Sequence, residues 1–439
     1  MKTSTLAIAL LASSAALAAV AVGAQAPAAA SSSQVWIHAG RVIAIAGEAP
    51  RGATTIVVQD GRIAAIHDGF RPAPTGVKVL DLKARTVLPG LIDSHTHLSS
   101  DRAGNEGIAA SVTDSLPLSS YETQWNGMKT LRAGFTTVRN LGDEKGKVLA
   151  YKEAVKRGWV QGPRILDAGE SISTTGGHMD GRVGLADDVH PMITTANLCD
   201  GADDCRRAVR RQVGRGADVI KFATTGGVNS GTGLATRMFE DEARALIDTA
   251  HAYGRKVAVH AHGLEGIRLA VRLGADSIEH GTMIDADTAK LMAKNGTFYV
   301  PTLSTVNGYL ERLAANPDAY PPAVKAQIDW RIGITGKSLQ IAVPLGVRIA
   351  YGTDAGVSKH GRNADEFELL VKFGMTPAEA IKAATINAAM LLGLDKETGT
   401  LEVGKSADII AVHGDPLADV RVLKAMKFVM ARGEVIRFD

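Results

Sequence analysis

Two histidines close the apolar run VLPGLIDSHTHL, which spans residues 87–98. His95 and His97 are separated by one residue, and alternate side chains of a strand point to the same face, so both imidazoles are expected on one face. Because imidazole is a common ligand of divalent metals, a metal site is one interpretation of the pair. The other interpretation is an exposed strand face that carries two polar side chains.

Further residues that can complete a metal site recur where later apolar strands are predicted to end. They are Lys221 in ADVIKFATTGG, His260 and His262 in KVAVHAHG, His280 in DSIEHGT and Asp354 in RIAYGTDAG. Side chains from separate strand ends can converge on one ion, so this recurrence favours the metal site over the exposed polar face.

Residues 89–395 alternate apolar strands with amphipathic stretches such as DEARALIDTAHAYG, a pattern typical of repeated βα units. The strand candidates are LPGLIDSH, FTTVRNL, RILDAG, DVIKFAT, KVAVHA, DSIEHG, TFYVPTL and RIAYGTDAG. Eight such units predict an α/β fold, a (β/α)8 TIM barrel whose C-terminal rim carries the candidate residues. A doubly wound open sheet is the alternative, although no glycine-rich phosphate loop follows the first strand.

The two ends of the mature chain have a different, β-rich character. Residues 33–88 contain short β-type runs separated by Gly, Pro and Asp turns, and residues 396–439 show the same pattern. We therefore expect both ends to pair into one small β-sandwich domain beside the metal-dependent barrel.

Residues 1–26 are typical of a secretory signal peptide. Lys2 is followed by an uncharged apolar stretch from Leu6 to Val22 and by a small-x-small cleavage site at residues 24–26. Cleavage would yield an exported, periplasmic or secreted protein that is not membrane-bound. An uncleaved anchor is the competing interpretation, but the stretch is Ala-rich, short for a membrane span, and precedes the linker-like PAAASSSQ.

The charge balance gives no general attraction to nucleic acid or to an anionic membrane. The 49 basic and 46 acidic side chains leave a formal net charge of +3. The expected partner is a small-molecule substrate, and a homo-oligomer is expected because closed symmetric assemblies are common among soluble enzymes.

The cysteines of the chain are Cys199 and Cys205, in NLCDGADDCRR. In an oxidising compartment they are expected to form a disulfide that stiffens this segment. A pair of thiolate metal ligands is the alternative, which the histidine and carboxylate candidates elsewhere in the chain make less attractive.

The order of the candidate residues resembles the amidohydrolase superfamily over nearly the whole mature chain. Histidines follow strand one, a lysine lies on strand four, histidines lie on strands five and six, and an aspartate lies on strand eight. The runs TTGGHMDG, IKFATTGGV, VAVHAHG and IEHGT are similar to its imidazolonepropionase-like branch, which includes prolidase-like and Xaa-Arg or Xaa-Lys dipeptidases. The resemblance implies two Zn²⁺ or other divalent ions. Their ligands would be His95, His97 and Asp354 for one ion and His260 and His280 for the other, with Lys221, carboxylated by CO₂, bridging the two.

The resemblance also implies the chemistry of the site. An ammonium has no lone pair for a metal, whereas a lysine carbamate is an anionic ligand with two oxygens. A zinc-bridged hydroxide would attack the scissile carbonyl, and the catalytic Asp354 would pass its proton to the leaving amine. His178 in TTGGHMDG and His262 are expected to bind the α-carboxylate of the substrate, although His262 is also a rival to His260 as metal ligand.

The resulting hypothesis is a binuclear zinc amidohydrolase that releases a C-terminal amino acid from dipeptides or N-acyl amino acids. One alternative is an amidase acting on an aromatic N-acyl amino acid such as ochratoxin. Another is a deaminase or cyclic-amide hydrolase, in which Glu265, five residues after His260, would shuttle the proton. Lys221 favours the binuclear enzyme over that reaction, and the intact ligand set argues against a non-catalytic metal-binding protein. Basic, proline, aromatic and aliphatic leaving residues all stay open, because loops choose between them.

Overall fold

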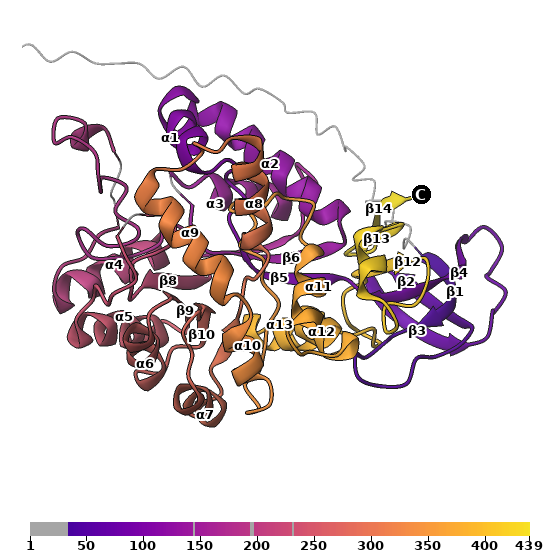
Figure 1. Cartoon of the computed structure of the whole chain (residues 1–439). Helices are drawn as coiled ribbons and strands as arrows, with labels where there is room; N and C mark the ends of the chain where they lie inside the picture. Colours follow the sequence, from indigo (N-terminus) through magenta and orange to yellow (C-terminus); the bar gives the residue numbers. More distant parts are fainter. Residues whose placement is uncertain (1–33, 144, 194–196, 231) are drawn as a thin grey trace, which may run out of the picture.

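A computed structural model describes residues 34–143, 145–193, 197–230 and 232–439. The predicted signal peptide at residues 1–26, and residue 33 of the predicted β unit, lie outside the described residues. Within the described part, no helix has both the length and the apolarity needed to cross a membrane. A large α/β body adjoins a sheet that contains both ends of the described chain (Figure 1).

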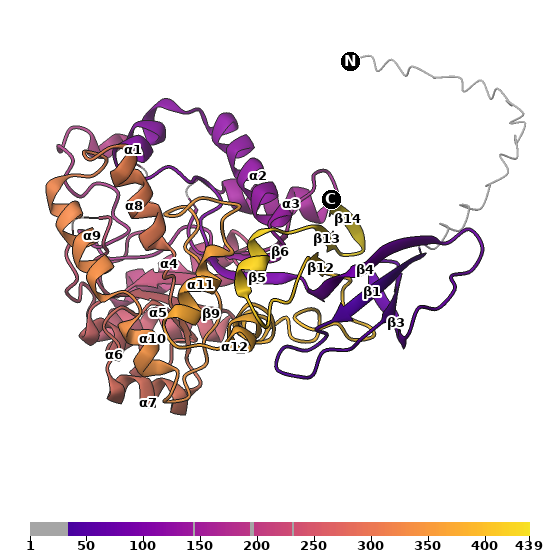
Figure 2. The same ribbon diagram turned by 45° about the vertical axis from the view of Figure 1, so that its right-hand side comes forward.

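The terminal sheet has seven strands in the order β14-β13-β12-β4-β1-β2-β3. Their bounds are β1 Gln34–Val42, β2 Thr54–Gln59, β3 Arg62–Asp68, β4 Lys78–Pro89, β12 Ile409–Val412, β13 Phe428–Ala431 and β14 Glu434–Phe438. The N-terminal strand β4 pairs with the C-terminal strand β12, so indigo and yellow strands lie side by side in Figures 1 and 2. Buried Ile37, Leu80, Ile409 and Phe428 share one apolar core, which joins the two ends into one β unit as predicted.

The barrel contains parallel strands in two hydrogen-bonded groups, β5-β6-β7 and β8-β9-β10-β11. Their bounds are β5 Leu91–Thr96, β6 Phe135–Asn140, β7 Arg164–Asp167, β8 Val219–Ala223, β9 Lys256–Ala261, β10 Ser277–His280 and β11 Phe298–Val300. A parallel bridge between Ile172 and Phe222 connects the two groups. Seven of the eight predicted strands are therefore regular strands of the barrel.

The eighth predicted strand is not a regular strand. Residues 348–356 instead form isolated parallel bridges to Tyr299 of β11 and to Thr96 of β5, which close the barrel. Asp354 has a left-handed backbone with φ of 56°, a conformation that interrupts an extended ladder. Gly352 allows a close approach, because a Cβ there would lie 2.4 Å from the Val300 side chain.

Helices alternate with the strands and cover the barrel (Figure 1). They are α1 Gly104–Thr113, α2 Leu116–Arg132, α3 Lys147–Lys156, α4 Ala202–Gly214, α5 Glu240–Ala252, α6 Leu264–Arg272, α7 Ala286–Asn295, α8 Thr305–Ala315, α9 Pro322–Ile334, α10 Lys337–Ala342, α11 Asp365–Lys372, α12 Pro377–Lys382 and α13 Ala388–Leu392. Local signals set their ends: at α7 the Asp285 side chain accepts from the Thr288 N–H at 2.9 Å, and Gly296 stops the helix with φ of 74°.

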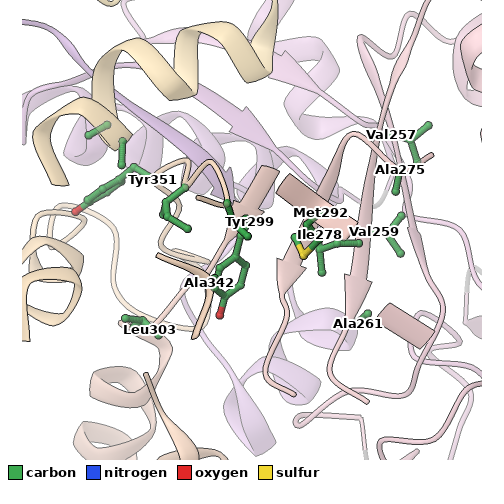
Figure 3. Close-up of a cluster of buried hydrophobic side chains, with 14 of the residues drawn as sticks. Val257, Val259, Ala261, Ala275, Ile278, Met292, Tyr299, Leu303, Ala342 and Tyr351 are labelled. Atoms are coloured by element: carbon green, nitrogen blue, oxygen red, sulfur yellow. The ribbon is translucent and has the colours of Figure 1, made fainter. Parts of the chain in front are cut away.

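Apolar packing between the strands and α7 fixes the positions of the strand ends. Val259 of β9, Ile278 of β10 and Met292 of α7 lie together in the buried cluster shown in Figure 3. Burying such side chains stabilises the fold by roughly 1.5–3 kcal/mol each. The functional side chains that follow these strands therefore start from a closely packed scaffold.

Candidate metal centre

A cavity of about 100 Å³ lies at the C-terminal ends of the barrel strands. Its lining consists of His95, His97, His178, Met179, Lys221, Val228, Asn229, His260, His262, His280, Thr305, Tyr309, Arg331, Asp354 and Val357. Every metal-ligand and substrate-binding residue predicted from the sequence is in this lining, and the roles of these residues stay predictions.

Two groups of potential metal ligands face this cavity. In one group are His95, His97 and Asp354, and in the other are His260, His262 and His280; within each group the ligand atoms lie within 4.8 Å of one another. Asp354 Oδ1 is 3.5 Å from His95 Nε2 and 3.3 Å from His97 Nε2. The buried His95 Nε2 has no hydrogen-bond partner among the described residues, as expected for an atom that coordinates an ion.

Partners behind the ligands orient several of the rings through Nδ1. These contacts are His95 to Glu279 Oε2 at 2.8 Å, His97 to the Gly142 carbonyl at 3.2 Å, His262 to Thr282 Oγ1 at 2.7 Å and His280 to Thr302 Oγ1 at 2.8 Å. Each contact occupies one ring nitrogen and leaves the other for the cavity.

The protonation states suit divalent metal binding. Burial lowers the pKa of His95 to about 4 and lowers the pKa values of His260 and His280 well below the ordinary range. These imidazoles are therefore neutral at neutral pH and can donate a lone pair. Burial raises the pKa of Asp354, but nearby His95, His97 and Lys221 outweigh that effect and bring it to about 2, so Asp354 is a carboxylate. The donor set fits a divalent metal such as zinc.

Lys221 lies on β8 and is 1% exposed. Among the described residues its Nζ forms neither a hydrogen bond nor an ion pair within contact distance, although Glu279 and Asp354 act on it electrostatically. Burial lowers the pKa of Lys221 to about 8. A lysine with this lowered pKa loses its proton near neutral pH more readily than an exposed lysine, and its neutral amine can then react.

The backbone is strained where ligands leave the strands. His280, Thr302 and Asp354 have left-handed φ values of 66°, 47° and 56°. Such conformations cost about 1–3 kcal/mol each in non-glycine residues and concentrate at functional sites. Two of these residues are predicted ligands and the third holds the ring of His280, so the strain coincides with the candidate site.

His178 reaches the cavity from the loop after β7. Its ring stacks on His260 with centroids 4.0 Å apart, and its Nδ1 lies 2.9 Å from Ser230 Oγ. Gly227 makes this approach possible, because a Cβ there would lie 2.1 Å from the His178 ring. His262, predicted as a second substrate contact, lies within ligand distance of His260 and His280, so the structure places it with the ligand group.

A disulfide joins Cys199 to Cys205, at the end of the His178 loop. The Cys199 N–H donates to the Ser173 carbonyl at 2.9 Å, and Thr175 Oγ1 donates to Asp200 at 2.7 Å. The cross-link thus anchors the segment that brings His178 to the cavity.

Arg331 of α9 and Tyr309 of α8 also line the cavity, and sequence reasoning missed both. Arg331 is 3% exposed and contacts Thr335 Oγ1 at 3.2 Å and two backbone carbonyls at 3.4 Å, with no ion pair to any described carboxylate. No motif surrounds either residue in the sequence, and only the fold brings α8 and α9 over the strand ends.

Glu265 does not reach the candidate site. Its side chain is 75% exposed on α6 and pairs with Arg268 at 3.0 Å, and it is absent from the cavity lining. The proton shuttle that the deaminase alternative requires is therefore not supplied by this residue.

Comparisons with known proteins agree with this geometry. The model of the amidohydrolase family matches residues 86–436. Ochratoxinase from Aspergillus niger is 31% identical over 411 residues, covering 90% of this chain and 84% of the relative. The crystal structure of a Xaa-Pro dipeptidase with bound methionine superimposes with a TM-score of 0.86 at 35% identity, covering 92% of this chain and 99% of that one. A prolidase complexed with N-methylphosphonate-L-proline gives 0.83 at 30% identity, with 92% and 100% coverage. The chain therefore belongs to the amidohydrolase family.

Proposed function

We propose that this hydrolase releases a C-terminal amino acid from dipeptides or N-acyl amino acids. The observation that carries the proposal is Arg331, a buried guanidinium without a carboxylate partner in the described chain, which shares one cavity with both ligand groups. A substrate α-carboxylate would supply the missing partner through charge-assisted hydrogen bonds. The adjacent amide would then lie in the same cavity as the predicted ligands.

In the proposed centre, His95, His97 and Asp354 would hold one Zn²⁺ or similar divalent ion and His260 and His280 would hold a second. Lys221, once carboxylated, would supply a further ligand group. When bound, the ions would supply an activated water and polarise the scissile carbonyl. Carboxylation of Lys221 would replace a buried cation that lacks a close counter-charge by an anionic group with two ligand oxygens. The ionised Asp354 can accept a proton from the attacking water and return it to the leaving amine.

The cavity lining favours an apolar or aromatic leaving residue. Val228, Tyr309 and Val357 provide apolar surface, and Asp354 is the only acidic residue among the lining side chains of the described chain. A basic leaving side chain would therefore lose hydration without gaining a counter-charge of its own. Because a relative is named ochratoxinase, we include ochratoxin, an aromatic N-acyl amino acid, among the proposed substrates.

We also propose that the protein acts outside the cytoplasm after removal of its N-terminal segment. The apolar stretch before the predicted cleavage site supports export. The Cys199–Cys205 disulfide supports it independently, since structural disulfides persist mainly in oxidising compartments.

A substrate panel tests the proposed reaction. Purified protein with Zn²⁺ and bicarbonate is offered N-acetyl derivatives of phenylalanine, leucine, proline and arginine, together with their C-terminal amides. The released products are measured by mass spectrometry: the free amino acid from each acid and the amino acid amide from each amide. We expect release from the phenylalanine and leucine acids and much slower release from the amides. Equal turnover of acids and amides would contradict carboxylate recognition, and preferred release of arginine would contradict the proposed apolar pocket.

A further inference from the structure

Among the histidines that line the cavity, His95 is set apart by the group that holds its Nδ1. Its partner is the Glu279 carboxylate. His262 and His280 contact threonine hydroxyls, and His97 contacts the backbone carbonyl of Gly142. A hydroxyl can donate or accept and so permits either tautomer of the ring. An ionised carboxylate can only accept, which requires the proton on Nδ1 and leaves the lone pair of Nε2 directed at the cavity.

Glu279 is itself held by a buried cation on another strand. Glu279 Oε1 accepts from Arg139 Nη2 at 2.7 Å, and the two side chains are 0% and 2% exposed. Arg139 Nη1 also donates to Ser277 Oγ at 3.1 Å, while Ser277 Oγ in turn donates to the same oxygen of Glu279. These contacts fix the position of the Glu279 carboxylate independently of its contact with His95.

Arg139 holds His95 at a second point. Its Nε donates at 2.6 Å to the carbonyl of Ser94, the residue directly before His95. One guanidinium thus secures both the backbone that enters His95 and the carboxylate that orients its ring. Arg139 belongs to β6 and Glu279 to β10, so the contacts cross the interior of the barrel behind the metal site.

We propose that Arg139 and Glu279 are positioning residues that set the tautomer and direction of His95, and thereby determine metal binding by the group of His95, His97 and Asp354. This inference rests on the proposed metal centre. A glutamine at position 279 can present its NH₂ to Nδ1, which moves the ring proton to Nε2 and removes the lone pair that a metal needs. Loss of such an outer partner typically weakens metal affinity roughly 10- to 100-fold.

The test compares Glu279→Gln with Thr302→Val, a matched variant that removes the partner of His280 in the other ligand group. Metal-stripped full-length protein is titrated with Zn²⁺ and bicarbonate against a chromophoric chelator, and ¹⁵N shifts of the histidine rings report the tautomer of His95 without metal. We expect Glu279→Gln to weaken one of two sites roughly 10- to 100-fold and to move the His95 proton to Nε2. Thr302→Val should leave the His95 tautomer unchanged.

The double variant Arg139→Met/Glu279→Leu removes both charges and also removes the acceptor of the His95 Nδ1 proton. It therefore separates the effect on the His95 ring from the cost of a buried unpaired guanidinium. We expect it to lose the same site, and Glu279→Asp to retain the wild-type tautomer. Folded Glu279→Gln and double variants that bind two ions with wild-type affinity would overturn the positioning role alone. Wild-type protein that binds no Zn²⁺ would overturn the proposed metal centre and this inference with it.

Discussion

Replacing Arg331 by methionine separates carboxylate recognition from the rest of the proposed mechanism. Methionine keeps much of the apolar volume of the side chain and removes its charge. A hydrogen bond to a charged group contributes about 1.5–3 kcal/mol, so kcat/KM for an N-acyl amino acid should fall roughly 10- to 150-fold. The fold should tolerate the change, because the existing contacts of Arg331 are 3.2–3.4 Å long and include no carboxylate among the described residues.

The assay compares two enzymes on two substrates in a double-mutant-cycle design. Wild-type and Arg331→Met proteins are each given N-acetyl-L-phenylalanine and its C-terminal amide, and kcat/KM is measured for all four combinations. We expect the wild-type preference for the acid to disappear in the variant, with most of the loss in KM. Arg244→Met is the control, since Arg244 is 54% exposed and pairs with Glu240 on the outer face of α5, where an ion pair contributes little.

A folded Arg331→Met protein that still prefers the acid as strongly as the wild type would refute carboxylate recognition by Arg331. A loss of equal size for the acid and the amide would also contradict it, because that result would indicate a general change in the cavity.

Four further expectations concern the scaffold of the site. Gly227→Ala should displace His178, since the new Cβ would lie 2.1 Å from its ring. We expect kcat/KM to fall roughly 10- to 100-fold without loss of bound zinc. Wild-type kinetics would argue against a substrate role for His178. The double variant Cys199→Ser/Cys205→Ser should lose roughly 2 kcal/mol of unfolding free energy in denaturant titrations, given the 6-residue separation, and an unchanged midpoint would contradict this. The same double variant should bind substrate more weakly in kinetic assays, because the loop of His178 loses its anchor. Burial raises the pKa of Glu366 from 4.5 to about 7, so its contribution to the unfolding free energy is present below pH 4.5 and is lost as pH rises through 7. Glu366→Gln should therefore remove a decrease of about 3 kcal/mol in unfolding free energy between these pH values. Parallel plots of unfolding free energy against pH for the wild type and the variant would contradict this.

The positions of most ligands could be predicted because they lie on, or next to, the C-terminal halves of apolar runs. His95, His260 and His280 end runs of buried residues, and parallel strands of a barrel bring such ends to one rim. The pairing of both chain ends followed from their β-rich runs and turns. These local patterns are compatible with one tertiary arrangement, a barrel beside a β unit formed by both chain ends.

The irregular eighth segment and the second half of the cavity could not be predicted in this way. The run RIAYGTDAG has the composition of a strand, but Asp354 adopts a left-handed backbone that only the finished barrel imposes. Arg331 lies on a helix far from any ligand motif, and its importance comes from burial beside the metal site. Glu279 precedes a predicted ligand, yet its role depends on Arg139, which contacts it from another strand.

The most direct test of the account is the release of phenylalanine from N-acetyl-L-phenylalanine by one preparation before and after metal is restored. We predict no free phenylalanine from protein stripped of metal by a chelator, and recovery of turnover when Zn²⁺ and bicarbonate are added together. Full turnover by the stripped protein, or no release of phenylalanine by protein that has bound two zinc ions per chain, would contradict the proposal of a metal-dependent hydrolase that removes a C-terminal amino acid.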